Sequence, residues 1–159
     1  MLEVLISIVV IAFGLLGIAG LQAFALKNNQ SASLRSTATV LASDIIDRIK
    51  ANPLAADQGH YNKSSAADYT TQVAGCLTTG GCGSPQQLAQ HDLYEWSQLV
   101  ASSLPNGRGV VCLDKSPIDG TTATPACDGT GNQYVVKIWW VDDRTRSAIP
   151  GQFTTQFEK

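Results

Sequence analysis

The sequence has few charged side chains. Lys, Arg, Asp and Glu make up 15% of the 159 residues, whereas about a quarter is usual in soluble proteins. The deficit is concentrated near the amino terminus, where no residue from Val4 to Leu26 is charged. The chain also lacks a block of Lys or Arg, and its formal net charge is −2. A surface that follows a phosphate backbone needs a basic stripe, so the composition argues against a nucleic-acid partner.

Motifs for catalysis and metal binding are missing as well. The sequence has no G-x-S-x-G element, no phosphate-binding loop and no C-x-x-C pair. The two histidines, His60 and His91, stand far from each other in the sequence. Asp119-Gly120 and Asp128-Gly129 lack the alternating oxygen ligands and the closing carboxylate of a calcium loop, which favours ordinary turns there. We therefore predict that the protein is not an enzyme and holds no cofactor or metal.

Four cysteines are present, an even number in a short chain, and this favours disulfides. Three pairings of Cys76, Cys82, Cys112 and Cys127 are possible in principle. Proximity in the sequence favours Cys76–Cys82 and Cys112–Cys127. Loop-closure entropy assigns about 2 and 3 kcal/mol to bonds that close loops of these lengths. Disulfides indicate an oxidising compartment, such as a periplasm or the cell exterior.

The first 26 residues predict a membrane helix. As a helix, the uncharged run Val4–Leu26 would extend about 34 Å, enough to cross a hydrocarbon layer of about 30 Å. A signal peptide would instead have a basic start and a shorter apolar core. Here an acid, Glu3, stands at the start and the apolar run is too long. We predict a transmembrane or filament-core helix over residues 1–26.

The helical pattern continues beyond the apolar run. Apolar residues recur at three- and four-residue steps at Leu34, Ala38, Leu41, Ile45 and Ile49. Because the residue before a proline is disfavoured in a helix, Asn52-Pro53 should end the helix. The pattern thus predicts a single helix of about fifty residues, roughly 75 Å long. Its amphipathic part, up to about residue 51, belongs to a globular head domain over residues 27–159.

Glu3 is the most informative residue of the apolar segment. A carboxylate buried in a membrane costs on the order of 3 kcal/mol. Two interpretations stay open: Glu3 lies at the membrane interface or favours the helix amino terminus, or it meets a positive group such as the terminal amine of another subunit. Gly14, Gly17 and Gly20 predict close helix–helix approach. Each costs roughly 1 kcal/mol of helix propensity, so they also predict local softening of the helix.

The remainder of the chain predicts an α+β head. Ser84 and Pro85 open a helix that ends near Ser103, and residues 53–83 predict an irregular connection. The apolar face expected for this helix comprises Leu88, Trp96, Leu99 and Val100. Strands are expected at Gly109–Asp114, Gln133–Val141 and Gln152–Phe157, with a turn at 142–144. Trp139 and Trp140 should point to opposite faces, one packing on the long helix and the other facing a partner subunit.

Several stretches resemble a known family. Residues 1–22 (MLEVLISIVVIAFGLLGIAGLQ) and 35–53 (RSTATVLASDIIDRIKANP) closely resemble the amino-terminal helix of type IV pilins. Among pilins, the chain is most similar to the minor pilins called PilV, or pilus modification proteins. The similarity resumes at SLPNGRGVVCLD, PACDG and YVVKIWWVDDR, which are residues 103–114, 125–129 and 134–144. The resemblance implies a pilin-like fold: a long helix with an exposed apolar half, packed on a small antiparallel sheet.

The resemblance also implies how the chain is processed, where it is located and which partners it has. In that family a basic leader is removed after a glycine, the new terminal residue is N-methylated, and an acidic residue near it orders subunits during assembly. Glu3 matches the acidic position, while no leader or processing glycine precedes Met1 in the sequence as given. The implied location is the inner membrane with a periplasmic head, and later the pilus tip. The implied partners are other minor pilins, the major pilin and a large tip adhesin, in a complex that primes assembly and supports twitching and adhesion.

Two alternatives to a minor pilin remain from the sequence. A minor pseudopilin of a type II secretion system shares the logic of the long helix. A membrane-tethered periplasmic enzyme or binding protein would need a cleft with perturbed ionisable groups. The cysteine-rich carboxy-terminal half argues mildly against the pseudopilin, and the missing motifs argue against the enzyme.

Overall fold

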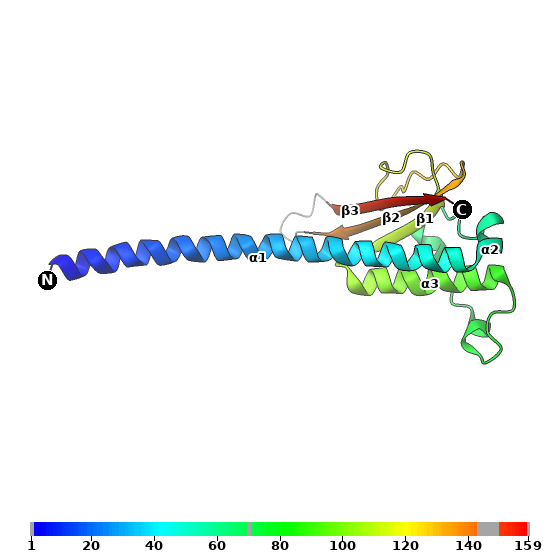
Figure 1. The fold of residues 1–159 in the computed structure, drawn as a ribbon, viewed down its shortest axis with the longest axis horizontal. Helices are drawn as coiled ribbons and strands as arrows, with labels where there is room; N and C mark the ends of the chain where they lie inside the picture. The colour runs from blue at the N-terminus through cyan, green and yellow to red at the C-terminus, as the bar shows by residue number, and fades with distance from the viewer. Residues whose placement is uncertain (1, 70, 143–149, 159) are drawn as a thin grey trace. The chain divides into compact units, whose positions relative to one another are not determined.

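The computed structural model of the chain describes residues 2–69, 71–142 and 150–158 (Figure 1). The chain divides into two compact units, Met1–Leu34 and Arg35–Lys159. The element order is α1 (Leu2–Ala51), α2 (Pro53–Asp57), the 3₁₀ helices η1 (Ala66–Tyr69) and η2 (Ala74–Leu77), α3 (Pro85–Ser103), β1 (Arg108–Leu113), β2 (Gln133–Val141) and β3 (Pro150–Glu158). The fold is α+β, with a long first helix, a small antiparallel sheet and a shorter second helix, as predicted.

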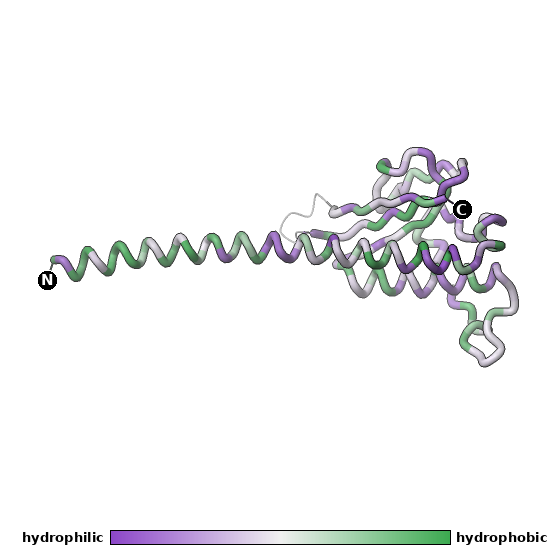
Figure 2. The backbone as a smooth tube through the Cα atoms, in the orientation of Figure 1, coloured by the Kyte–Doolittle hydropathy of each residue, from purple (hydrophilic) through white to green (hydrophobic). Residues whose placement is uncertain are grey.

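Helix α1 changes character along its length. Every residue from 2 to 30 is exposed, and apolar residues dominate this stretch (Figure 2). In the second unit α1 contributes buried residues that recur at helical spacing: Ala38, Leu41, Ala42, Ile45 and Ile49. The predicted amphipathic stripe is thus confirmed, except that Leu34 at its start is only partly buried.

The predicted end of α1 is confirmed, but the chain re-enters a helix at once. Asn52 leaves the helical conformation with φ −127° and ψ 64°, and Pro53 becomes the first residue of α2. Proline is suited to that position because its φ is already helical and its missing N–H has no helical partner. The prediction of an irregular connection over residues 53–83 was therefore wrong for α2, η1 and η2.

Helix α3 has the predicted bounds and cap. The side chain of Ser84 accepts a hydrogen bond from the backbone N–H of Gln87 at 3.2 Å. The side chain of Gln87 reaches back to the N–H of Gly83 at 2.9 Å, rather than to that of Ser84 as in a capping box. These bonds satisfy amide groups that would otherwise lack partners at the helix start.

The predicted apolar face of α3 is partly wrong. Trp96 and Val100 are buried, but Leu88 and Leu99 are 36% and 42% exposed. The rotation of the helix is set by Trp96, whose indole N–H donates to the carbonyl of Leu41 at 2.8 Å. A Cβ atom at Gly109 would lie 2.3 Å from the Trp96 ring, so glycine is required there for strand and helix to approach. With Trp96 inward, the buried face of α3 also contains Ala89 and Leu93.

The three strands form one antiparallel sheet in the order β1-β2-β3. Central strand β2 pairs Val136 with Val111 of β1 and with Thr155 of β3. Strand β2 has the predicted bounds, β1 is shifted by one residue toward the amino terminus, and β3 is longer than predicted at both ends. The turn expected at 142–144 falls mostly outside the described residues.

The two faces of the sheet are covered by different parts of the head. Tyr134 lies on the face toward the helices, where its hydroxyl donates to the carbonyl of Ala56 in α2 at 2.8 Å. Trp139 lies on the other face and packs with Val110 and Cys112. Because strand residues alternate, Trp140 shares the face of Tyr134.

Trp139 and Trp140 therefore point to opposite faces, as predicted, but neither is available to a partner. They are 1% and 2% exposed. The expectation that one of them faces another subunit was wrong. The reason is that the connection from β1 to β2 folds back over the outer face, bringing Cys127 against Trp139 and Cys112.

Candidate assembly site and the polar clusters of the head

The exposed apolar surface of α1 in the first unit is the candidate assembly site. It covers residues 2–26, none of which is buried. The large side chains are more than half exposed, among them Leu2, Ile8, Phe13, Leu16, Leu21 and Phe24. Soluble monomers rarely expose a continuous apolar patch of this kind. By length and composition α1 could cross a membrane, so this surface needs lipid or other protein around it.

Glu3 lies in the first turn of α1, where an acid interacts favourably with the helix dipole. Its side chain is exposed. Its carbonyl accepts a hydrogen bond from the hydroxyl of Ser7 at 2.8 Å, the usual back-bonding of a serine in an apolar helix. The carboxylate thus stands at one end of an uncharged surface.

No contact within the described residues explains the glycines of the candidate site. A Cβ atom built at Gly14, Gly17 or Gly20 would meet nothing within 4 Å. All three residues lie within the helix and are exposed. Glycine at these positions costs helix propensity and gains no contact among the described residues.

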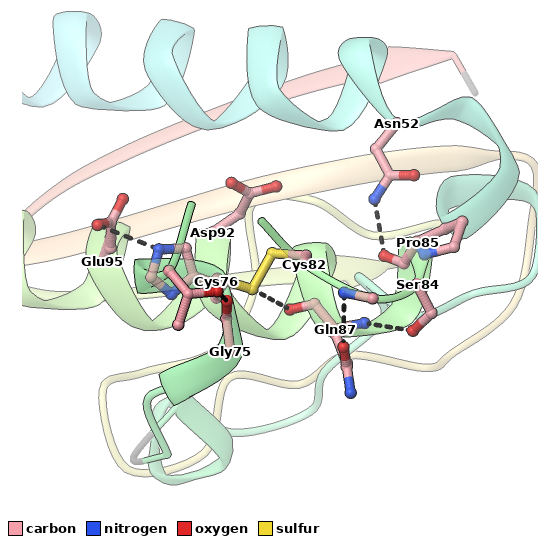
Figure 3. The surroundings of a disulfide bond; sticks show 12 residues. Asn52, Gly75, Cys76, Cys82, Ser84, Pro85, Gln87, Asp92 and Glu95 are labelled. Atoms are coloured by element: carbon pink, nitrogen blue, oxygen red, sulfur yellow. Dashed lines mark hydrogen bonds and ion pairs between the residues drawn. A yellow bond between two sulfur atoms is a disulfide. The ribbon is translucent and has the colours of Figure 1, made fainter. Parts of the chain in front are cut away.

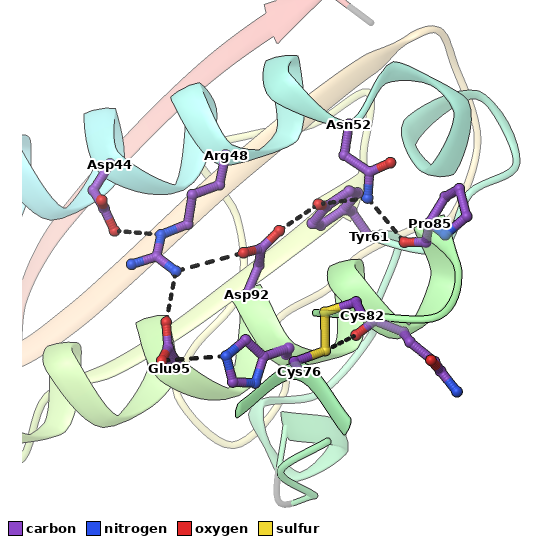
Figure 4. A network of polar contacts seen from close by, with 11 residues as sticks. Asp44, Arg48, Asn52, Tyr61, Cys76, Cys82, Pro85, Asp92 and Glu95 are labelled. Carbon is purple, nitrogen blue, oxygen red and sulfur yellow. Dashed lines mark hydrogen bonds and ion pairs between the residues drawn. A yellow bond between two sulfur atoms is a disulfide. The ribbon is translucent and has the colours of Figure 1, made fainter. Parts of the chain in front are cut away.

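A polar cluster joins α1 to α3 in the head (Figure 4). The guanidinium of Arg48 contacts carboxylates on both helices: Asp44 at 3.1 Å, Glu95 at 3.0 Å and Asp92 at 3.5 Å. Because one arginine is shared by three carboxylates, the cluster holds α1 and α3 in a fixed register.

Asp92 is the buried member of this cluster. It is 7% exposed and accepts a hydrogen bond from the hydroxyl of Tyr61 at 2.7 Å. Burial raises the pKa of Asp92, while the Tyr61 hydroxyl and the Arg48 guanidinium act in the opposite direction. Burial also raises the pKa of Tyr61, and its bond to Asp92 adds to that rise.

Asn52 extends the cluster to the start of α3. Its side-chain amide donates to the carbonyl of Pro85 at 2.8 Å and to the hydroxyl of Tyr61 at 3.2 Å. The residue that breaks the long helix therefore also ties it to α3. From the sequence, Asn52 was predicted only to end the long helix.

The Cys76–Cys82 disulfide closes a short exposed loop beside α3 (Figure 3). The sulfur of Cys76 lies 3.8 Å from the carbonyl oxygen of Gln87, so the loop is held against the first turn of α3. His91 lies in the same part of α3, with Nε2 3.3 Å from Glu95. Its Nδ1 is buried and has no hydrogen-bond partner among the described residues.

The Cys112–Cys127 disulfide pins the β1–β2 connection to the sheet. Beneath this connection lies Lys137, which is 0% exposed. Its ammonium lies 2.6 Å from Asp114 and 3.0 Å from Asp119, and donates to the carbonyl of Pro125 at 2.9 Å. Both disulfides are those that sequence proximity favoured.

The partners of Lys137 were not predicted from the sequence, although a signal was present. Lys137 is the only charged residue in the apolar run QYVVKIWWV. A lysine in the middle of a buried strand needs a carboxylate within reach, because an unpaired buried charge is strongly disfavoured. The sequence does not reveal which of the nearby acids supplies it.

The described surface of the head has several hollows, one of them lined by His60, Lys63 and Asp68. The hollow between α3 and the start of β1 has a volume of about 430 Å³, and the ionisable residues in its lining are Tyr69 and Arg108. The Tyr69 hydroxyl already accepts a hydrogen bond from the N–H of Val111. Within the described ranges, no three His, Cys, Asp or Glu side chains are grouped as metal ligands.

The fold and the candidate site together define a class: proteins with an exposed apolar amino-terminal helix that continues into an α+β head. Residues 20–94 match the family model described as "Type IV pilin Tt1218" (Tt1218-like). The match runs from the apolar part of α1 into α3 and covers slightly less than half of the chain. The similarity supports a pilin role. No curated protein and no solved structure matches the chain.

Proposed function

We propose that the chain is a minor pilin of the PilV kind, which takes part in a tip complex that primes type IV pilus assembly. The observation that carries the proposal is the uncharged, fully exposed surface of α1 with Glu3 at its start. Before assembly this segment, residues 1–26, lies in the inner membrane with the head in the periplasm. After assembly it lies in the filament core, where apolar packing replaces lipid.

Glu3 and the three glycines have distinct roles in this proposal. An unpaired carboxylate in an apolar core is disfavoured, so Glu3 sets the register in which a subunit finds a positive partner group. Gly14, Gly17 and Gly20 have free space around them, which allows another helix to come close. The subunit's partners would be other minor pilins, the major pilin and a large tip adhesin, and the pilus would support twitching and adhesion.

The proposal is tested in a strain whose only copy carries Glu3→Ala. We expect the subunit to accumulate in the membrane at the normal level while surface pili and twitching fall sharply. Asp47→Ala is the matched control, because Asp47 is an exposed acid of the same helix outside the apolar segment. It should leave piliation unchanged.

Normal pili with a stable Glu3→Ala subunit would contradict the assigned role of Glu3. Intact pili in a full deletion strain would contradict the minor pilin itself. Loss of protein secretion in that strain would then favour a pseudopilin of a type II secretion system, and normal secretion a tethered periplasmic protein.

A further inference from the structure

The two edges of the sheet differ in how their backbone groups are satisfied. The outer edge of β1 is bonded to neighbouring segments at Val111 and Leu113, and these bonds satisfy the outward N–H and C=O groups of both residues. Four bonds do this, each 2.9 Å long: Val111 N–H to the Tyr69 hydroxyl, Lys63 N–H to the Val111 carbonyl, Leu113 N–H to the Asn62 side-chain oxygen, and Gly129 N–H to the Leu113 carbonyl. An edge closed in this way cannot pair with another strand.

The same bonds fix which backbone groups of β3 point outward. Because Val111 points its backbone groups away from β2, its partner Val136 must point its own toward β3. Val136 pairs with Thr155, whose backbone groups therefore face β2. By alternation along the strand, the outward backbone groups of β3 belong to Gln152, Thr154, Gln156 and Glu158.

The outward groups of β3 have no partners in the part of the chain that the structure describes. No other segment there bonds to the backbone of residues 152, 154, 156 or 158 on this side. Protected edges usually carry a charge, a proline or a bulge in mid-strand. Here Gln152, Thr154 and Gln156 are uncharged, and the strand pairs with β2 without interruption from Pro150 to Glu158.

The side chains at this edge also favour an added strand. Phe153 and Phe157 lie on the helix-side face, opposite Ile138 and Tyr134 of β2. Both phenylalanines are only partly buried. Phe157 stacks on Tyr134, and the centroids of the two rings are 5.7 Å apart. Apolar residues on a neighbouring strand would cover their remaining exposed surface.

We propose that the outer edge of β3 accepts an extended strand from another pilin subunit. The incoming strand is apolar at the alternate positions that flank Phe153 and Phe157. It is polar at the positions beside Gln152, Thr154 and Gln156, and carries no acid next to Glu158. Backbone bonds supply the attachment and the two phenylalanines supply the preference for an apolar partner. This inference rests on the proposed function, since it takes the partner from the pilus.

The decisive variant is Thr154→Pro. It removes one outward N–H and leaves the β2–β3 ladder intact, because the N–H of residue 154 does not bond to β2. Thr154→Val is the matched control, since it keeps the N–H and suits a strand. Gln156→Pro is a second variant of the same design, in case one proline lowers stability. Thermal unfolding of each full-length chain in detergent shows which variants fold normally.

Two measurements follow. Sheared pili are probed by immunoblot, and recovery of a folded proline variant should fall about tenfold, equivalent to about 1.4 kcal/mol of lost binding. Recovery of Thr154→Val should equal that of the wild type. Hydrogen exchange of the wild-type amides at 152, 154 and 156 should be fast in the detergent-solubilised chain and slow in pili.

Equal recovery of a folded proline variant and Thr154→Val would overturn the inference, as would equally fast exchange in both states. A dimer of this chain alone in detergent, lost in Thr154→Pro, would also overturn it, because the partner would then be a second copy. Absence of the wild-type chain from sheared pili would refute the proposed function, and with it the inference. The first two outcomes leave the proposed function standing.

Discussion

Lys137 and Asp114 form the most deeply buried ion pair among the described residues of the head, with exposed side-chain fractions of 0% and 1%. Lys137→Met would leave Asp114 without its cation beneath the β1–β2 connection. We expect the free energy of unfolding to fall by about 3–5 kcal/mol, as for other buried pairs that lose one partner. Denaturant unfolding followed by tryptophan fluorescence measures this change.

The double variant Lys137→Met/Asp114→Asn serves as the control for that prediction. With both charges gone, no buried charge is left unpaired, so the double variant should be more stable than Lys137→Met alone. If the two variants are equally unstable, the loss of unfolding free energy comes from altered packing and not from the unpaired charge of Asp114.

The raised pKa of Tyr134 predicts that the head loses stability at alkaline pH. Burial raises the pKa of Tyr134 from 10.0 to about 12, and the charge of Asp57 adds to the rise. The folded state thus favours the protonated hydroxyl, which donates to Ala56. The resulting stability is fully present below pH 10.0 and is lost as pH rises toward about 12.

Denaturant unfolding over that pH range measures the effect. Burial raises the pKa of Tyr61 and Tyr69 in the same direction, so Tyr134→Phe should reduce the alkaline loss without abolishing it. An unchanged slope in Tyr134→Phe would show that Tyr134 does not contribute. At neutral pH the variant should lose about 1 kcal/mol, the usual worth of a hydrogen bond.

The two disulfides should contribute differently at the level of elements. Loop-closure entropy assigns about 3 kcal/mol to Cys112–Cys127 and about 2 kcal/mol to Cys76–Cys82. The first bond also lies in the core against Trp139, whereas the second closes an exposed loop. Replacing each pair with alanine should therefore destabilise the head more for Cys112–Cys127.

Thermal unfolding of the two double-alanine variants checks this order. Near-ultraviolet circular dichroism is a second readout, since loss of Cys112–Cys127 should alter the tryptophan signal and loss of Cys76–Cys82 should not. The reverse order of stability would contradict the prediction.

Elements with local signals could be predicted from the sequence, and those set by tertiary packing could not. Pro53 predicts where α1 ends, and Ser84 predicts where α3 begins. The apolar run of residues 133–141 predicts β2. The rotation of α3 depends on the Trp96–Leu41 bond, which leaves Leu88 and Leu99 outside. Burial of both tryptophans depends on how the β1–β2 connection folds back, which no local pattern specifies.

The residues of the candidate site could all be named from the sequence, and their role in assembly stays a prediction. The features of this site, which are the apolar run, Glu3 and the glycines, all lie within one helix and are visible in the linear sequence. The Arg48–Asp92 cluster and the Lys137–Asp114 pair join residues distant in the sequence. Charge alone did not indicate which acid would meet which base.

At the scale of the whole molecule, the head should fold without the apolar segment. Every buried residue among those described lies at or beyond Ala38, and the unit Arg35–Lys159 has its own core. We expect a fragment of residues 35–159 to stay in solution without detergent. Its free energy of unfolding should lie within about 1 kcal/mol of that of the full chain, because no described residue before Arg35 is classed as buried. Thermal unfolding of the fragment in buffer and of the full chain in detergent provides the comparison.

A fragment that is unfolded or strongly destabilised would show that residues before Arg35 contribute to the head. The fragment Met1–Leu34, in contrast, should require detergent to remain in solution. The disulfides must be formed in both head preparations, since reduction would lower stability for a separate reason.

The ties between α1 and α3 determine how the head responds to tension. A pull along α1 reaches α3 through the Trp96–Leu41 bond, the Arg48 ion pairs and the Asn52–Pro85 bond. These attachments are spaced along the last turns of α1 and would be loaded side by side, in shear, so that none bears the whole force. Tension applied along α1 would therefore load the two helices in shear before it separates the strands of the sheet.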